Sequence, residues 1–145
     1  MTTRFRGALL LLLPAVAQAA SNDGARASFD ATASCERKAT KGRVICDVEL
    51  EAAAGRIAWA DVVVTEAPAF APPLRSRVGI ADARSRTERR VRLPVALLAT
   101  SLGRGTVKMR ARAVVCLAST VGAETCRPVT KDVAAEIVVG TDVEH

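Results

Sequence analysis

The sequence has few of the residues from which most active sites are built. Its 145 residues include one histidine, which is the last residue, no tyrosine, three phenylalanines and one tryptophan. These absences exclude a histidine metal site, a catalytic pair of histidine with serine or cysteine, and an aromatic platform for stacking nucleic-acid bases. The chain also lacks a glycine-rich phosphate loop. We therefore expect a protein that is not an enzyme, holds no metal or cofactor, and does not recognise a specific nucleic-acid sequence.

The start of the chain carries the three parts of a cleavable signal peptide in the usual order. Two arginines precede a short apolar run that Pro14 ends, and an A-Q-A cleavage site follows at 17–19. The apolar run is too short to span a bilayer, and no other run approaches that length. We expect a secreted or periplasmic protein with no membrane span, in which residues 1–20 are removed and 21–145 form one domain whose tail frays after Gly140.

Export changes the interpretation of the four cysteines, Cys35, Cys46, Cys116 and Cys126. An even number of cysteines in an oxidising compartment indicates disulfides. Their spacing lacks the closely paired ligands of a zinc site. Four cysteines allow three pairings. One is local, Cys35–Cys46 with Cys116–Cys126, and another is nested, Cys46–Cys116 with Cys35–Cys126.

The alternation of apolar and polar residues helps to choose between these pairings. Residues 27–35 and 44–51 alternate strictly, which is typical of half-buried strands, and the charged segment between them contains a glycine. This pattern predicts a hairpin. With Cys35 opposite Cys46, apolar residues face apolar ones along the whole hairpin, and a slip by one residue would destroy the match. The register therefore favours the two local disulfides.

The remaining chain also has the pattern of short strands. We expect them at about 56–66, 74–80, 88–93, 106–116 and 127–139. Apolar and polar residues alternate poorly over 56–66, which is typical of a strand that is buried on both faces or contains a bulge. Trp59 in this strand is expected to pack between the sheets. Pro94–Leu102 is expected to form a helical turn. About seven short strands indicate an all-β protein, an antiparallel β-sandwich with two disulfides.

Two features resemble a known family of folds. The stretches 91–94 and 102–112 resemble the E strand, the connection and the F strand of bacterial immunoglobulin-like or fibronectin type III-like domains, and Cys46, Trp59 and Cys116 follow the immunoglobulin Cys…Trp…Cys order. The sequence departs from the pattern because valine stands two residues before the second cysteine, where tyrosine is expected, and because it has two extra cysteines. The resemblance implies an immunoglobulin-like sandwich and a Cys46–Cys116 disulfide, against the register, and it implies no chemistry.

Basic residues are the strongest functional signal. Lysine and arginine number 21 against 15 acidic residues, a net charge of +6, and +4 remains without the two arginines of the signal peptide. Between Arg75 and Arg112 there are eleven basic residues, with only Asp82 and Glu88 as acids. Such a surface would bind an envelope polyanion: glycolipid phosphate, acidic polysaccharide or extracellular DNA. The alternative is a solvated face whose charges pair across strands.

Cross-strand pairing accounts for part of this charge. The second strand carries an acidic row, Asp47, Glu49 and Glu51. In an immunoglobulin-like strand order this row faces Arg90 and Arg92, and the second local disulfide sets Arg110 opposite Asp132. Six basic residues keep no obvious partner: Arg75, Arg77, Arg84, Arg86, Lys108 and Arg112. The four that lie close together in sequence, Arg75, Arg77, Arg84 and Arg86, are the candidate ligand-binding residues of a non-enzymatic binding or structural module.

The proline-rich segment 67–73 supports a second hypothesis, a small secreted protease inhibitor. A stiff loop in a disulfide-stapled domain loses little entropy when it binds a protein partner, and Phe70 or Leu74 would be the residue presented. The hypothesis requires Phe70 to be exposed rather than tucked back onto the sandwich. Asp61, an acid in an apolar strand, would support an enzyme only in a cleft with a second acid.

Overall fold

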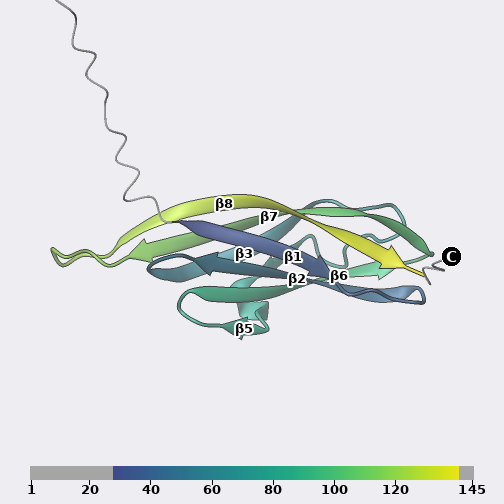
Figure 1. The fold of residues 1–145 in the computed structure, drawn as a ribbon, viewed down its shortest axis with the longest axis horizontal. Helices are drawn as coiled ribbons and strands as arrows, with labels where there is room; N and C mark the ends of the chain where they lie inside the picture. Colours follow the sequence, from purple (N-terminus) through teal and green to yellow (C-terminus); the bar gives the residue numbers. More distant parts are fainter. Residues whose placement is uncertain (1–27, 141–145) are drawn as a thin grey trace, which may run out of the picture.

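Two antiparallel four-stranded sheets contain all the strands that the structure, a computed structural model, describes over residues 28–140. The elements in chain order are β1 (Phe29–Cys35), β2 (Gly42–Ala52), β3 (Arg56–Glu66), β4 (Arg77–Gly79), the short 3-10 turn η2 (Ile80–Asp82), β5 (Ser85–Arg86), β6 (Arg90–Ala99), β7 (Gly103–Leu117) and β8 (Thr125–Val139). Sheet A has the order β1-β2-β6-β5 and sheet B the order β4-β3-β7-β8 (Figure 1).

These sheets confirm the expected all-β, antiparallel class, with eight strands among the described residues where about seven were expected. No helix in residues 28–140 is long and apolar enough to cross a membrane. The signal peptide expected over 1–20 and the tail after Gly140 lie outside the described residues.

The β1–β2 hairpin has the register that the alternation of the sequence predicts. Cys35 lies opposite Cys46, and the pairing continues without a slip to Phe29 opposite Ala52. Any shift by one residue would turn the buried side chains of β2 to solvent, so the apolar pattern fixes the pairing.

Both local disulfides are present, Cys35–Cys46 and Cys116–Cys126. Each bridges two residues that are direct partners in neighbouring antiparallel strands. The local pairing is therefore confirmed, and the Cys46–Cys116 disulfide implied by the immunoglobulin resemblance is wrong, because each of these cysteines is already bonded to its neighbour on the adjacent strand.

One core lies between the inward faces of the two sheets. Its fully buried members include Val44, Val48 and Leu50 on β2, Val91, Leu93, Val95 and Leu97 on β6, and Val107, Met109 and Val115 on β7. They occupy alternate positions, because successive side chains of a strand point to opposite faces. Burial of each large side chain stabilises the fold by roughly 1.5–3 kcal/mol. The positions between them point outward, and these carry the charged residues.

Trp59 is not in the core, and the expectation that it packs between the sheets is wrong. The β3–β7 pairing has an irregularity between Ile57 and Trp59, where β3 carries the extra residue Ala58. A bulge of this kind reverses the alternation. Ile57 before the bulge is buried in the core, and so are Ala60 and Val62 after it. Trp59 is thereby turned to the outer face of sheet B.

The helical turn expected over Pro94–Leu102 is also wrong, because β6 runs on through Pro94 to Ala99. On the edge of β6 that faces away from β2, the carbonyl of Arg92 accepts from the N–H of Arg84 at 2.9 Å, and the carbonyl of Ala96 accepts from the N–H of Leu74 at 2.9 Å. Alternate residues of an antiparallel strand direct their backbone N–H and C=O groups toward the same edge of the strand. The nitrogen of Pro94 therefore faces this irregular edge, where a missing donor costs no ladder hydrogen bond.

The strand expected over 74–80 is shorter than the sequence predicts. Of the residues 74–80, only those of β4 pair with β3, and Leu74 is 52% exposed. The preceding residues instead join the free edge of β6, where Pro73 forms an isolated bridge with Leu97. The segment 72–86 thus crosses from the edge of sheet A to β4 in sheet B and back to β5 in sheet A.

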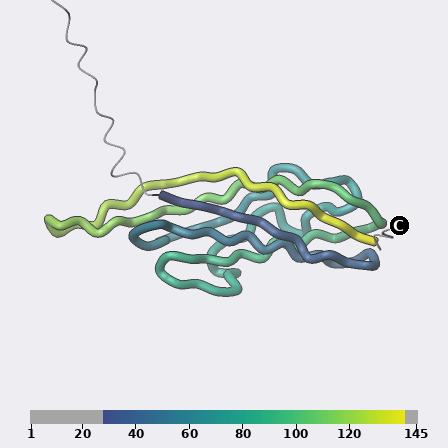
Figure 2. Tube along the Cα trace, in the orientation of Figure 1, coloured from purple at the N-terminus to yellow at the C-terminus, as the bar shows by residue number. Residues whose placement is uncertain are grey.

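The opposite side of the molecule closes where the edge strands of the two sheets meet. β1 and β8 run side by side (Figures 1 and 2), and Lys131 forms an ion pair with Asp30 between them. Beyond the end of β1, Lys38 pairs with Val139 in a parallel bridge. At the other side the edge strands β4 and β5 are only three and two residues long. Short or covered edges of this kind limit pairing with other chains.

Candidate functional site

Three of the four candidate arginines form ion pairs with acidic residues. Arg75 forms an ion pair with Asp82 at 2.9 Å, Arg77 with Asp61 at 2.6 Å, and Arg84 with Asp47 at 3.4 Å. Lys108 and Arg112 also have partners, Glu66 and Asp61. The expectation that these five residues lack partners is therefore wrong. The crossing segment 72–86 and the β3–β7 pairing bring the acids to them, which sequence spacing does not show.

Arg86 alone of the candidate set has no ion pair among the described residues. It lies on β5 and lines a separate depression with Arg56, Ile57 and Glu88. The four candidates do not form one site, because Arg75 and Arg84 lie on one side of the fold, Arg77 is turned toward the outer face of sheet B, and Arg86 lines this other depression.

The acidic row of β2 is paired as the sequence predicts. Arg90 contacts Glu49 at 3.4 Å and Glu51 at 3.1 Å, and Arg92 contacts Asp47 at 3.1 Å. In sheet B, Arg110 and Asp132 form the expected pair at 2.9 Å. The hydrogen bond to Asp132 raises the pKa of Arg110. Much of the positive charge is thus neutralised on each sheet separately, so the arginines do not form a continuous basic face.

Arg75 and Arg84 do share one feature, a groove of about 440 Å³ on the outer face of sheet A. Outward residues of β2 and β6 form its floor, and the crossing segment forms its wall. The lining residues are Arg43, Ile45, Leu74, Arg75, Val78, Asp82, Arg84, Pro94 and Ala96. We call this feature the Arg43 groove. The hydrogen bonds of Leu74 and Arg84 to β6 fix the wall against the floor.

Arg43 is the residue that sequence reasoning missed. It is exposed on β2, lines the groove, and has no ion pair or hydrogen-bond partner among the described residues. The hairpin register already places it on the same face as Ile45 and Asp47. Its importance depends on the β2–β6 pairing, which sets Arg43 opposite Leu98 and not opposite an acid. That pairing joins segments some fifty residues apart and has no local signal.

A second cluster lies on the outer face of sheet B around Asp61. Its carboxylate is fully buried. Arg112 donates from Nε to one oxygen at 2.7 Å and from a terminal nitrogen to the other, and Arg77 contacts it as well. Both guanidinium groups lie over the ring of Trp59, 5.9 and 5.8 Å from its centroid. The partners of Asp61 are therefore two cations, and no second acid joins it for acid–base chemistry.

The proline-rich loop does not present Phe70 to solvent. The ring packs against β7, where a Cβ atom on Gly103 would meet it at 3.0 Å and one on Gly105 at 3.4 Å. The two glycines thus leave room for the ring, which contacts the core. Leu74, the other candidate of this loop, is exposed but forms part of the groove wall. The inhibitor hypothesis therefore loses its anchor residue.

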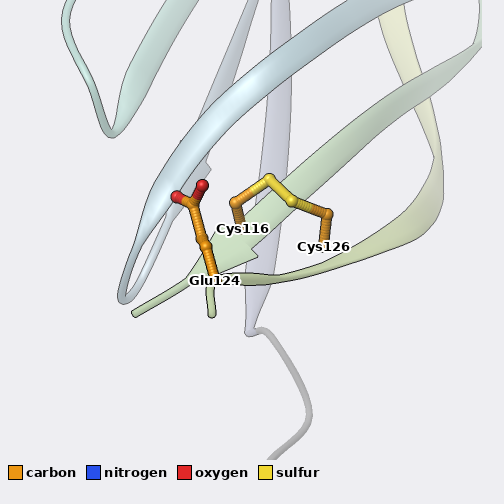
Figure 3. A group of neighbouring side chains, drawn as sticks. All are labelled: Cys116, Glu124 and Cys126. Carbon is orange, nitrogen blue, oxygen red and sulfur yellow. A yellow bond between two sulfur atoms is a disulfide. The ribbon is translucent and has the colours of Figure 1, made fainter. Parts of the chain in front are cut away.

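Cys116, Glu124 and Cys126 bring their potential metal-ligand atoms within 4.8 Å of one another (Figure 3). The two sulfur atoms are bonded to each other, so neither is a thiolate that could bind a metal. Glu124 accepts two hydrogen bonds from Arg56, at 2.6 and 2.8 Å, and these lower its pKa. The group therefore fastens the turn end of the β7–β8 hairpin.

No protein-family model matches this chain, and no curated protein or solved structure shows significant similarity to it.

Proposed function

We propose that this protein is a non-enzymatic binding module of the periplasm or the secreted space, which holds an anionic ligand in the Arg43 groove. The observation that carries the proposal is an exposed guanidinium without a carboxylate partner, placed at a concave site. Arg75 and Arg84 add two further cations, and among the described residues Asp82 is the only acid in the lining. The volume lies within the range of about 300–1,000 Å³ that is usual for small-molecule sites.

The location rests on separate observations. The start of the sequence has the pattern of a signal peptide, and two disulfides form among the described residues. Disulfides persist in oxidising compartments. An anion of the cell envelope or the surrounding medium is therefore the ligand class that we consider.

The order of strands supports the finer assignment of an immunoglobulin-like sandwich. The sheet order β1-β2-β6-β5 corresponds to strands A, B, E and D of that fold, and β3-β7-β8 corresponds to C, F and G, with β4 as an added edge strand. This assignment concerns architecture alone, because one fold supports many functions. The functional proposal therefore rests on the groove.

The test is titration of the purified protein with three anions: a heparin fragment, pyrophosphate and decyl phosphate, at low and physiological salt. We expect at least one to bind, and Arg43→Gln to weaken it about tenfold or more, since a hydrogen bond to a charged group contributes on the order of 1.5–3 kcal/mol. Arg127→Gln is the matched control, because Arg127 is also an exposed strand arginine without an ion pair among the described residues. Equal losses in the two variants, or no binding of any anion, would contradict the proposal.

A further inference from the structure

The floor of the Arg43 groove is apolar along its whole length. Ile45 lies opposite Ala96, and Pro94 is the next outward residue of β6. Leu74 covers this strip from the side with a side chain that is 52% exposed. A half-exposed leucine in a hydrogen-bonded wall leaves apolar surface in contact with water, and a ligand with an apolar part would bury it.

Charge is found at the two ends of this strip and not along it. Arg43 lies opposite Leu98 at one end, and at the other end Asp47 lies opposite Pro94. Asp47 already binds Arg84 and Arg92, so both guanidinium groups at that end share a carboxylate partner. Asp82 in the wall likewise forms an ion pair with Arg75. Arg43, which has no partner among residues 28–140, therefore stands at one end of an apolar floor.

The distance between the two ends limits the ligand. Arg43 and Asp47 are four residues apart on β2, which corresponds to about 13 Å of strand. None of the described residues that line the groove is aromatic, so they offer no surface for stacking a sugar or a base. An aliphatic chain needs only apolar contact, which Ile45, Leu74 and Ala96 provide.

We infer that the ligand is an anionic single-chain amphiphile, with its carboxylate or phosphate head on Arg43 and its aliphatic chain over Ile45 and Ala96 toward Pro94. The inference rests on the proposed function, because it assigns the chemical class of the same anion. The guanidinium offers a planar fork of donors that fits either head group. Leu74 closes over the chain from the wall.

The experiment is titration of the purified protein with butanoate, hexanoate, octanoate and decanoate, and with butyl and decyl phosphate, below the concentrations at which they form micelles. We expect affinity to rise by up to three- to fourfold for each added methylene that is buried, throughout the series, because the extended chain of decanoate is no longer than the floor of about 13 Å. The carboxylate and phosphate series identify which head group binds better.

Leu74→Ser should lower the affinity for decanoate several-fold and that for butanoate much less, because butanoate has less chain for Leu74 to cover. Leu102→Ser is the matched control, because Leu102 is 62% exposed but lies outside the groove lining. Far-UV circular dichroism of each variant confirms that it is folded. Chain-length dependence that persists in Leu74→Ser, or is lost equally in Leu102→Ser, would overturn the inference.

The outcomes separate the inference from the proposed function. Binding of pyrophosphate or heparin that depends on Arg43, with equal affinities for butanoate and decanoate, would overturn the amphiphile and leave the anion site standing. Binding of decyltrimethylammonium as strong as that of decanoate would overturn both, since the charge of the head would then be irrelevant.

Discussion

Arg112 on β7 binds both carboxylate oxygens of Asp61 on β3, and this pair is the best-buried ionic contact on the outer face of sheet B. The two residues are direct partners in the β3–β7 ladder. Arg77 from β4 adds a second cation, so one fully buried acid links three strands. The Trp59 ring against the two guanidinium groups shields the carboxylate from water.

Replacement of Asp61 should therefore destabilise the fold. Asp61→Asn removes the charge and one acceptor oxygen, and we expect the free energy of unfolding to fall by about 1–3 kcal/mol, the cost of leaving buried hydrogen-bond groups unmet. This loss is smaller than the loss from breaking a fully buried ion pair, because water can hydrate the arginine side chains that the substitution leaves without a partner. Urea denaturation measures it. Asp132→Asn is the control, since Asp132 is 71% exposed in its pair with Arg110 and should change little. Equal effects of the two substitutions would show that burial of Asp61 is unimportant.

The two edges of β6 should respond differently to proline. Val95→Pro should destabilise by about 3 kcal/mol or more, because it removes a donor directed at β2 in the middle of sheet A and adds a steric clash. Pro94→Ala should cost at most about 1 kcal/mol, because the position needs no donor and only the restriction of the unfolded chain is lost. Thermal and urea unfolding of both variants compare the two edges. A large loss for Pro94→Ala with a small one for Val95→Pro would refute the orientation of β6.

The Arg56–Glu124 pair at the turn end of the β7–β8 hairpin should make the free energy of unfolding depend on pH in the acid range. Hydrogen bonds from Arg56 lower the pKa of Glu124, so the folded state binds its proton less readily than the unfolded state. The stabilisation is then complete above the ordinary glutamate pKa of about 4.3 and is lost as the pH falls through the lowered value. The difference in unfolding free energy between the native protein and Glu124→Gln should shrink over this range. Arg56→Gln should remove the same pH dependence, and a difference that stays constant from neutral to acid pH would contradict the assignment.

Local patterns in the sequence sufficed for the hairpin, its register and both disulfides. In each case the two strands are neighbours in the chain, and alternation of apolar and polar residues leaves a single register in which both faces match. The same alternation predicted strands over 88–93 and 106–116, where the alternate residues Val91, Leu93, Val107 and Met109 lie in the core. The paired acidic row of β2 followed from assuming a strand order.

Tertiary structure decided the side of the sheet on which Trp59 lies, the continuation of β6 through Pro94, and the partners of Arg75, Arg77 and Arg84. The bulge at Ala58 and the irregular outer edge of β6 have no separate signal in the composition of their segments. Ion pairs that join residues 61 and 112, or 47 and 84, depend on which strands become neighbours, and strand pairing is a property of the whole chain. Arg43 acquires its place in a groove for the same reason: β2 fixes the face on which it points, whereas β6 and the crossing segment supply the apolar floor and the wall beside it.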